Sequence, residues 1–95
     1  MSEVYLDYNA SAPVRPRAQA AVAQALEDRY GNPSSIHRPG HRAKVLLESS
    51  RASVAALLGG RAEEVVFTSG GTESNNQALF GAALSHASGH LIVTA

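Results

Sequence analysis

The 95-residue chain contains no cysteine and no tryptophan, and it has a single lysine. Without cysteine, these residues cannot form a disulfide, a thiolate metal site or a thiol nucleophile. We expect Lys44 to face solvent, because it lies in a helical pattern and a lysine that forms a Schiff base needs a desolvated or cation-flanked pocket. These absences argue against covalent catalysis by a thiol or an amine of this segment.

Net charge and long apolar runs are also missing. Eight basic and eight acidic residues cancel, and Lys and Arg are nowhere dense enough to follow a row of phosphates, so we expect no nucleic-acid partner. No run approaches the roughly 18 apolar residues of a membrane span, so we expect no membrane partner and a cytoplasmic protein. The hydrophobic fraction of 44% is typical of a globular chain.

The four histidines lack the nearby acidic or cysteine companions that a metal site requires. His37 and His41 have the spacing of one helical face, but Pro39 and Gly40 lie between them and are expected to break the helix. We therefore predict no metal site.

Helical periodicity is clear in three places. A first amphipathic helix is predicted from Pro16, with Gly31 just past its end. A polar loop of ten residues, 31–40, separates it from a second helix at 41–58, whose apolar face includes Leu57 and Leu58 and which Gly59 and Gly60 terminate. A third helical stripe begins at Thr72.

Short apolar runs alternate with these helices. Val4–Asp7, Val65–Phe67 and Leu91–Val93 have the pattern of short strands. The order of elements predicts an α/β fold with crossover helices. So few strands would leave sheet faces and at least one edge uncovered, which natural proteins avoid, so we expect the chain to be part of a longer one.

The sharpest local feature is the passage from a strand through Gly70 and Gly71 into a helix. Glycines allow an anion to approach the backbone, and the first N–H groups of a helix lack intrahelical partners, so this turn is a candidate phosphate site. It matches neither the dinucleotide fingerprint nor the P-loop. The local alternative is an ordinary helix cap made by Ser69 or Thr72, and the turn alone leaves both interpretations open.

Three ordered motifs carry a family resemblance: Tyr5-Leu6-Asp7-Tyr8-Asn9-Ala10-Ser11, Gly31-Asn32-Pro33-Ser34-Ser35-Ile36-His37, and Phe67-Thr68-Ser69-Gly70-Gly71-Thr72-Glu73-Ser74-Asn75. Together they resemble the start of cysteine desulfurases and cover nearly the whole chain. The match looks like the nitrogen-fixation and iron-sulfur-cluster branch. The sulfur-mobilisation branch and the selenocysteine lyases are expected to carry different loops here.

The resemblance implies an α/β enzyme, the amino-terminal part of a fold type I transferase similar to aspartate aminotransferase, with an incomplete parallel or mixed sheet and flanking helices. Residues 1–15 would form an arm at the active-site mouth and residues 16–95 the start of the large cofactor-binding domain. The cofactor implied is pyridoxal 5'-phosphate, with Gly71 and Thr72 holding its phosphate. Asn9 and Asn32 are expected along the substrate path.

The activity implied is conversion of L-cysteine to L-alanine by a homodimer. The resemblance also implies that an enzyme persulfide passes the sulfur to an acceptor or iron-sulfur scaffold protein. The family's Schiff-base lysine and nucleophilic cysteine belong to later sequence, so we predict no catalytic residue here and an inactive chain on its own. Two alternatives stay open: another class V lyase or aminotransferase, and a short non-catalytic protein that complements a split enzyme.

Overall fold

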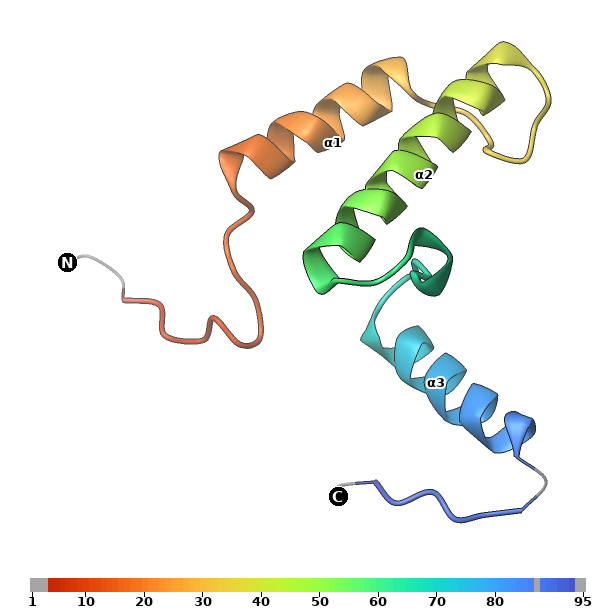
Figure 1. Cartoon of the computed structure of the whole chain (residues 1–95). Helices are drawn as coiled ribbons and strands as arrows, with labels where there is room; N and C mark the ends of the chain where they lie inside the picture. Colours follow the sequence, from red (N-terminus) through yellow and green to blue (C-terminus); the bar gives the residue numbers. More distant parts are fainter. Residues whose placement is uncertain (1–3, 87, 94–95) are drawn as a thin grey trace. The chain divides into compact units, whose positions relative to one another are not determined.

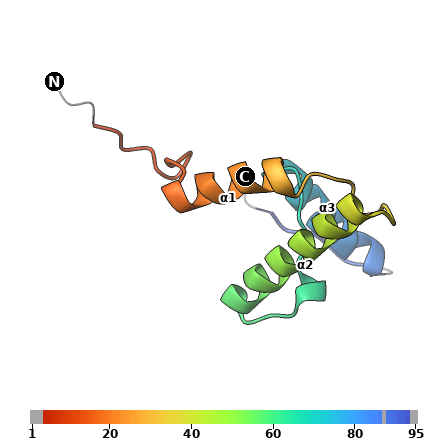
Figure 2. The ribbon, with the colours of Figure 1, turned by 90° about the horizontal axis from the view of Figure 1, so that it is seen from above.

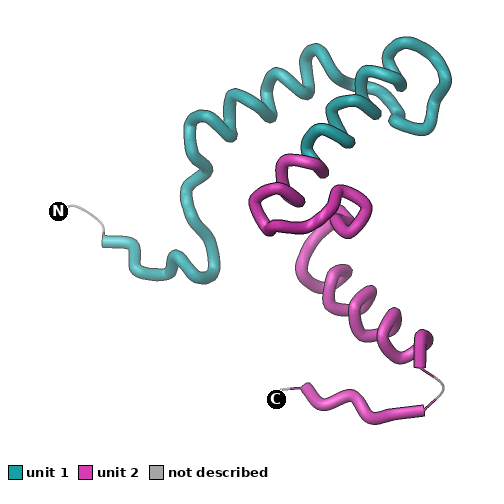
Figure 3. Tube along the Cα trace, in the orientation of Figure 1, with its two compact units in different colours: residues 1–50 teal, residues 51–95 magenta. Residues whose placement is uncertain are grey.

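The computed structural model describes residues 4–86 and 88–93. Its elements are α1 (Pro16–Asp28), α2 (Arg38–Leu58), the short 3-10 helix η1 (Ala62–Glu64) and α3 (Gly71–Ser85), as Figure 1 shows. All three predicted helices are present. The chain divides into two units, residues 1–50 and 51–95, with the boundary inside α2 (Figure 3). Each unit is described by itself.

The predicted sheet is not found in the described residues. None of them is assigned to a strand, and residues 4–15 run as an irregular trace in both ribbon views (Figures 1 and 2). Val4–Asp7, Val65–Phe67 and Leu91–Val93 are all irregular. A strand exists through hydrogen bonds to a neighbouring strand, and these segments have no such partner in residues 4–86 and 88–93. The helical part of the expected fold is confirmed and its sheet is not.

In the first unit, α1 begins as its sequence predicts but ends earlier than expected. Pro16 occupies the first helical turn, where its missing N–H is not needed. The helix stops at Asp28, and the N–H of Arg29 closes it on the carbonyl of Ala25 at 3.0 Å. Gly31, predicted as the helix stop, lies further along with φ of +145°. A Cβ there would stand 2.7 Å from the carbonyl oxygen of Pro39, so this glycine permits a close approach to α2.

The start of α2 corrects the sequence prediction. The helix begins at Arg38 and not at residue 41, because Pro39 lies in the first turn, where helices tolerate proline. The N–H of Gly40 donates to Nδ1 of His37 at 3.2 Å, so the imidazole caps the helix. The N–H of His41 adds a bond to the His37 carbonyl at 3.0 Å. The expected break between the two histidines is therefore wrong.

The far end of α2 follows the predicted glycine stop. Gly59 has φ of +71°, and its N–H bonds to the carbonyl of Ala56 at 3.4 Å. The N–H of Gly60 bonds to the carbonyl of Ala55 at 2.9 Å. These two bonds make a Schellman motif, which satisfies the last carbonyls of the helix.

Fewer residues of α2 are buried than its apolar pattern predicts. Among the described residues, the buried ones are Gly40, Ala43 and Ala55. Leu57 and Leu58, predicted on the same face, are 85% and 74% exposed. Lys44 is exposed, as expected. No helix in residues 4–86 and 88–93 is long and apolar enough to cross a membrane.

In the second unit, Arg51 of α2 fixes the irregular segment that precedes α3. Its guanidinium donates a hydrogen bond to the carbonyl of Val65 and lies 5.5 Å from the ring centroid of Phe67. One side chain therefore contacts both ends of the apolar run 65–67. That run leads directly into the turn at the start of α3.

Candidate phosphate-binding turn at the start of α3

The turn before α3 is open on its glycine side. Gly70 is the N-cap residue, with extended backbone, and its carbonyl accepts the first helical bond from the N–H of Ser74 at 3.1 Å. A Cβ built on Gly70 or on Gly71 would meet no atom within 4 Å. An external group can therefore reach the backbone of both glycines.

The hydroxyl groups of Thr68, Ser69 and Ser74 bond to other groups of the turn and not to the helix N–H groups. The Ser69 hydroxyl donates to Oε2 of Glu73 at 2.5 Å, and the Ser69 N–H donates to the same oxygen at 2.7 Å. Oγ1 of Thr68 lies 2.6 Å from Oγ of Ser74. No side chain caps α3, so the ordinary cap by Ser69 or Thr72 considered for this turn is not formed.

The first N–H groups of α3 are consequently available. Within the described residues, no acceptor bonds to the N–H of Gly71 or of Thr72, the first two helical positions. These groups point out of the positive end of the helix dipole, where an anion is stabilised. The Thr72 hydroxyl adds a possible third donor. The two residues predicted from sequence thus stand together at one helix terminus.

Glu73 is the residue of this turn that the sequence analysis missed. Its hydrogen bond from the Ser69 hydroxyl, and then the one from the Ser69 N–H, hold the pKa of its carboxyl below the usual value. The available signal was a glutamate at the third helical position after the N-cap, which reaches back toward the residues before the helix.

The other polar residues considered for function make local bonds. Oδ1 of Asn32 accepts the N–H of Ser34 at 2.9 Å, which is an Asx turn. The Asp7 carbonyl accepts the N–H of Ala10 at 3.1 Å, and Asn9 lies exposed inside that turn. These contacts position the two loops within the first unit and leave the substrate-path role of Asn9 and Asn32 as a prediction.

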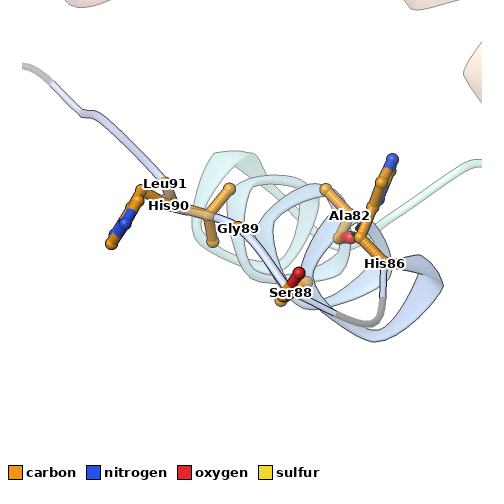
Figure 4. A pocket seen from close by; sticks show the side chains of 7 residues that line it. Ala82, His86, Ser88, Gly89, His90 and Leu91 are labelled. Atoms are coloured by element: carbon orange, nitrogen blue, oxygen red, sulfur yellow. Dashed lines mark hydrogen bonds between the residues drawn. The ribbon is translucent and has the colours of Figure 1, made fainter.

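A hollow of about 480 Å³ lies at the end of α3, lined by Ala82, Ala83, His86, Ser88, Gly89, His90 and Leu91. Figure 4 shows it from close by. Its two imidazoles point away from each other in that view. Nδ1 of His86 lies 2.9 Å from the carbonyl oxygen of Ala82 and 3.0 Å from the Ser85 hydroxyl, so this imidazole bonds to the last turn of α3. Across residues 4–86 and 88–93, no three His, Cys, Asp or Glu residues gather as a metal site would require.

Comparison with known proteins identifies relatives over most of the chain. A selenocysteine lyase from Xenopus laevis is 48% identical over 80 residues, which cover 84% of this chain and 19% of the lyase. The cysteine desulfurase IscS of Dictyoglomus turgidum is 44% identical over 94 residues, or 97% of this chain and 24% of the relative. A cysteine desulfurase from a Frankia strain is 45% identical over 78 residues, or 82% of this chain and 19% of the relative.

The motifs led us to expect the nitrogen-fixation and iron-sulfur-cluster branch of the cysteine desulfurases. In overall identity the selenocysteine lyase is as similar to this chain as the desulfurases are, so overall identity does not separate the two groups, and the expected difference in their loops stays a prediction. The chain spans about a fifth of the length of the relatives it matches. The family described as aminotransferase class-V matches residues 4–95. The chain therefore belongs to the class-V aminotransferase family.

Proposed function

We propose that this chain is the amino-terminal segment of a pyridoxal-phosphate-dependent cysteine desulfurase of fold type I, which converts L-cysteine to L-alanine. The observation that carries the proposal is the uncapped start of α3, where the N–H groups of Gly71 and Thr72 face an open glycine turn. Desulfurase relatives at 44% and 45% identity support the reaction class. In this proposal the segment anchors the cofactor, and the rest of the enzyme performs the chemistry.

Pyridoxal phosphate fits the turn by the chemistry of its donors. A phosphate needs several N–H or O–H donors in a positive potential, and the two backbone N–H groups with the Thr72 hydroxyl offer three. The open space at Gly70 and Gly71 allows a phosphate to reach the backbone. When bound, the cofactor supplies an electron sink for bond cleavage on the amino-acid substrate. Gly71 and Thr72 hold and orient one end of it.

The reactive groups belong to the part of the enzyme outside these 95 residues. The chain has no cysteine, and its single lysine lies exposed on α2. We propose that a lysine and a cysteine elsewhere in the full-length protein perform proton transfer and nucleophilic attack on sulfur. The 95 residues alone are then inactive.

The full-length enzyme in this proposal is a cytoplasmic homodimer with residues 1–15 near the active-site mouth and residues 16–95 opening the large domain. The exposed apolar side chains of the segment support a larger assembly: Leu6 and Leu84 are each 86% exposed and Ile92 is 96% exposed. Apolar surface of this extent is usually covered by another part of the protein or by a partner. The sulfur passes to an acceptor or iron-sulfur scaffold protein.

A second candidate substrate is L-selenocysteine. The selenocysteine lyases of Xenopus laevis and Xenopus tropicalis are 48% and 49% identical to this chain, which favours this substrate as much as the desulfurases favour cysteine. The phosphate contacts proposed here are the same for both substrates, because they involve only the cofactor.

The test uses the full-length protein that carries this segment. After purification with pyridoxal phosphate, it should show the visible absorbance of the bound cofactor. With an added thiol reductant, which reduces the enzyme persulfide, it should release sulfide from L-cysteine and form an equal amount of L-alanine. Selenide release from L-selenocysteine with no sulfide from cysteine would replace the first substrate by the second. Absence of both activities in a cofactor-loaded protein would contradict the proposed reaction, and failure to load would contradict the cofactor.

A further inference from the structure

The carboxylate of Glu73 is tied to the residue just before the N-cap. One oxygen, Oε2, accepts both the hydroxyl of Ser69 at 2.5 Å and its N–H at 2.7 Å. On the neighbouring side of the turn, Oγ1 of Thr68 donates to the Gly70 carbonyl at 3.1 Å and pairs with Oγ of Ser74 at 2.6 Å. The polar side chains around the turn are thus occupied with one another.

This arrangement keeps two competitors away from the helix start. Serine hydroxyls are strong acceptors for the first N–H groups of a helix, and a glutamate in the first turn is attracted to the same positive end. Because Oε2 of Glu73 accepts both the hydroxyl and the N–H of Ser69, the Ser69 side chain is held beside Glu73, and in the described residues its oxygen accepts no bond from the first N–H groups of α3. Glu73, in turn, has its Oε2 directed to Ser69, and no bond joins it to the N–H of Gly71 or Thr72 in the described residues.

We propose that Glu73 is a positioning residue that restrains Ser69 and thereby keeps the N–H groups of Gly71 and Thr72 open for the cofactor phosphate. The inference rests on the proposed function, and it adds a residue that acts on the phosphate site without touching the phosphate. Glu73 also brings a negative charge near a bound anion, which by itself disfavours binding. The hydrogen bonds of Glu73 therefore favour binding of the phosphate, whereas its charge disfavours it.

Two substitutions separate these effects. Glu73→Gln keeps an oxygen that accepts the Ser69 hydroxyl and N–H but removes the charge, whereas Glu73→Ala removes both. In the full-length protein, Glu73→Ala should weaken pyridoxal phosphate binding about tenfold, which is the scale of losing one hydrogen bond to a charged group. Glu73→Gln should bind as tightly as the native protein or more tightly.

The comparison ligand is pyridoxal, which lacks the phosphate. Its affinity should be unchanged in both variants, because Glu73 acts only through the phosphate contacts. The double variant S69A/E73A should recover at least half of the loss on a logarithmic scale, because it removes the hydroxyl that competes for the helix N–H groups. Glu63→Ala is the matched control: this glutamate is also exposed in the second unit, and it pairs with Arg61 at 3.4 Å on the surface.

The experiment measures the dissociation constants of both ligands by cofactor fluorescence, with melting temperatures recorded alongside. The positioning role is overturned if Glu73→Ala binds pyridoxal phosphate as well as the native protein, if it loses pyridoxal equally, if Glu73→Gln is as weak as Glu73→Ala, or if the double variant shows no recovery. A native protein that binds pyridoxal phosphate no more tightly than pyridoxal overturns the proposed function itself. The two failures are therefore distinguishable.

Discussion

The guanidinium of Arg51 lies 5.5 Å from the ring centroid of Phe67 and donates a hydrogen bond to the carbonyl of Val65. This pair connects α2 to the three-residue run that leads into the turn at Gly70. We expect Arg51→Ala to destabilise the protein by about 1 to 3 kcal/mol, from one charge-assisted hydrogen bond and one cation–π contact. Arg51→Lys should lose less stability than Arg51→Ala, because lysine keeps a positive charge at this position. Urea unfolding monitored by circular dichroism measures both, and an alanine variant as stable as the native protein would contradict the contact.

Gly40 should not tolerate a methyl group. It is buried, and a Cβ there would stand 2.5 Å from the carbonyl oxygen of Ser35 and 2.7 Å from that of Asn32. Gly40→Ala should cost about 1 to 3 kcal/mol of stability, as overpacking usually does. Gly81→Ala is the matched control inside α3, where a Cβ meets no atom within 4 Å. It should stabilise by about 0.5 to 1 kcal/mol. Equal effects of the two changes on thermal unfolding would refute the proposed packing.

The cap on α2 predicts an order of stability among His37 variants. Nδ1 of His37 accepts the N–H of Gly40, the third residue of the helix. His37→Ala should lower the free energy of unfolding by about 1 kcal/mol, and His37→Asn should restore most of it because asparagine is a preferred N-cap. Chemical denaturation provides the comparison. The assignment fails if alanine and asparagine are equally stable at this position.

Glu73 makes the stability of the protein depend on pH, and the direction of this dependence follows from its pKa. The hydroxyl and N–H of Ser69 hold the pKa of this carboxyl below its ordinary value of 4.5. A lowered folded-state pKa means that the stabilisation is fully present above pH 4.5 and is lost as the pH falls through the folded-state pKa. The melting temperature of the native protein should therefore fall more steeply below pH 4.5 than that of Glu73→Gln. Identical pH profiles would contradict the bonds between Glu73 and Ser69.

The sequence predicted what depends on local periodicity. Pro16 marked the start of α1, and the Gly59-Gly60 pair marked the end of α2, since both act through the backbone of their own helix. The start of α2 was missed because Pro39 and Gly40 look like loop residues, although the first helical turn accepts both when His37 supplies the cap. Gly31 was taken for a helix stop, whereas its role depends on a carbonyl eight residues away.

The sheet and the site show the limits of local patterns. The apolar run 65–67 has strand composition, but a strand also needs a partner, and none is present in the described residues. Gly71 and Thr72 were named from a motif, and the geometry that leaves their N–H groups open was not predictable, since the Ser69 hydroxyl could either accept a helix N–H or donate to Glu73. In the structure the Ser69 hydroxyl donates to Glu73 and no side chain caps α3.

The central claim is that the N–H groups of Gly71 and Thr72 bind the cofactor phosphate, and Gly71→Pro tests it most directly. Proline removes the N–H at the first helical position, where its ring suits the helix, and the extended Gly70 before it is compatible with proline. In the full-length protein, we predict that this change weakens binding of pyridoxal phosphate about tenfold and leaves binding of pyridoxal unchanged. Equal affinity of the native and Gly71→Pro proteins for pyridoxal phosphate would contradict the account.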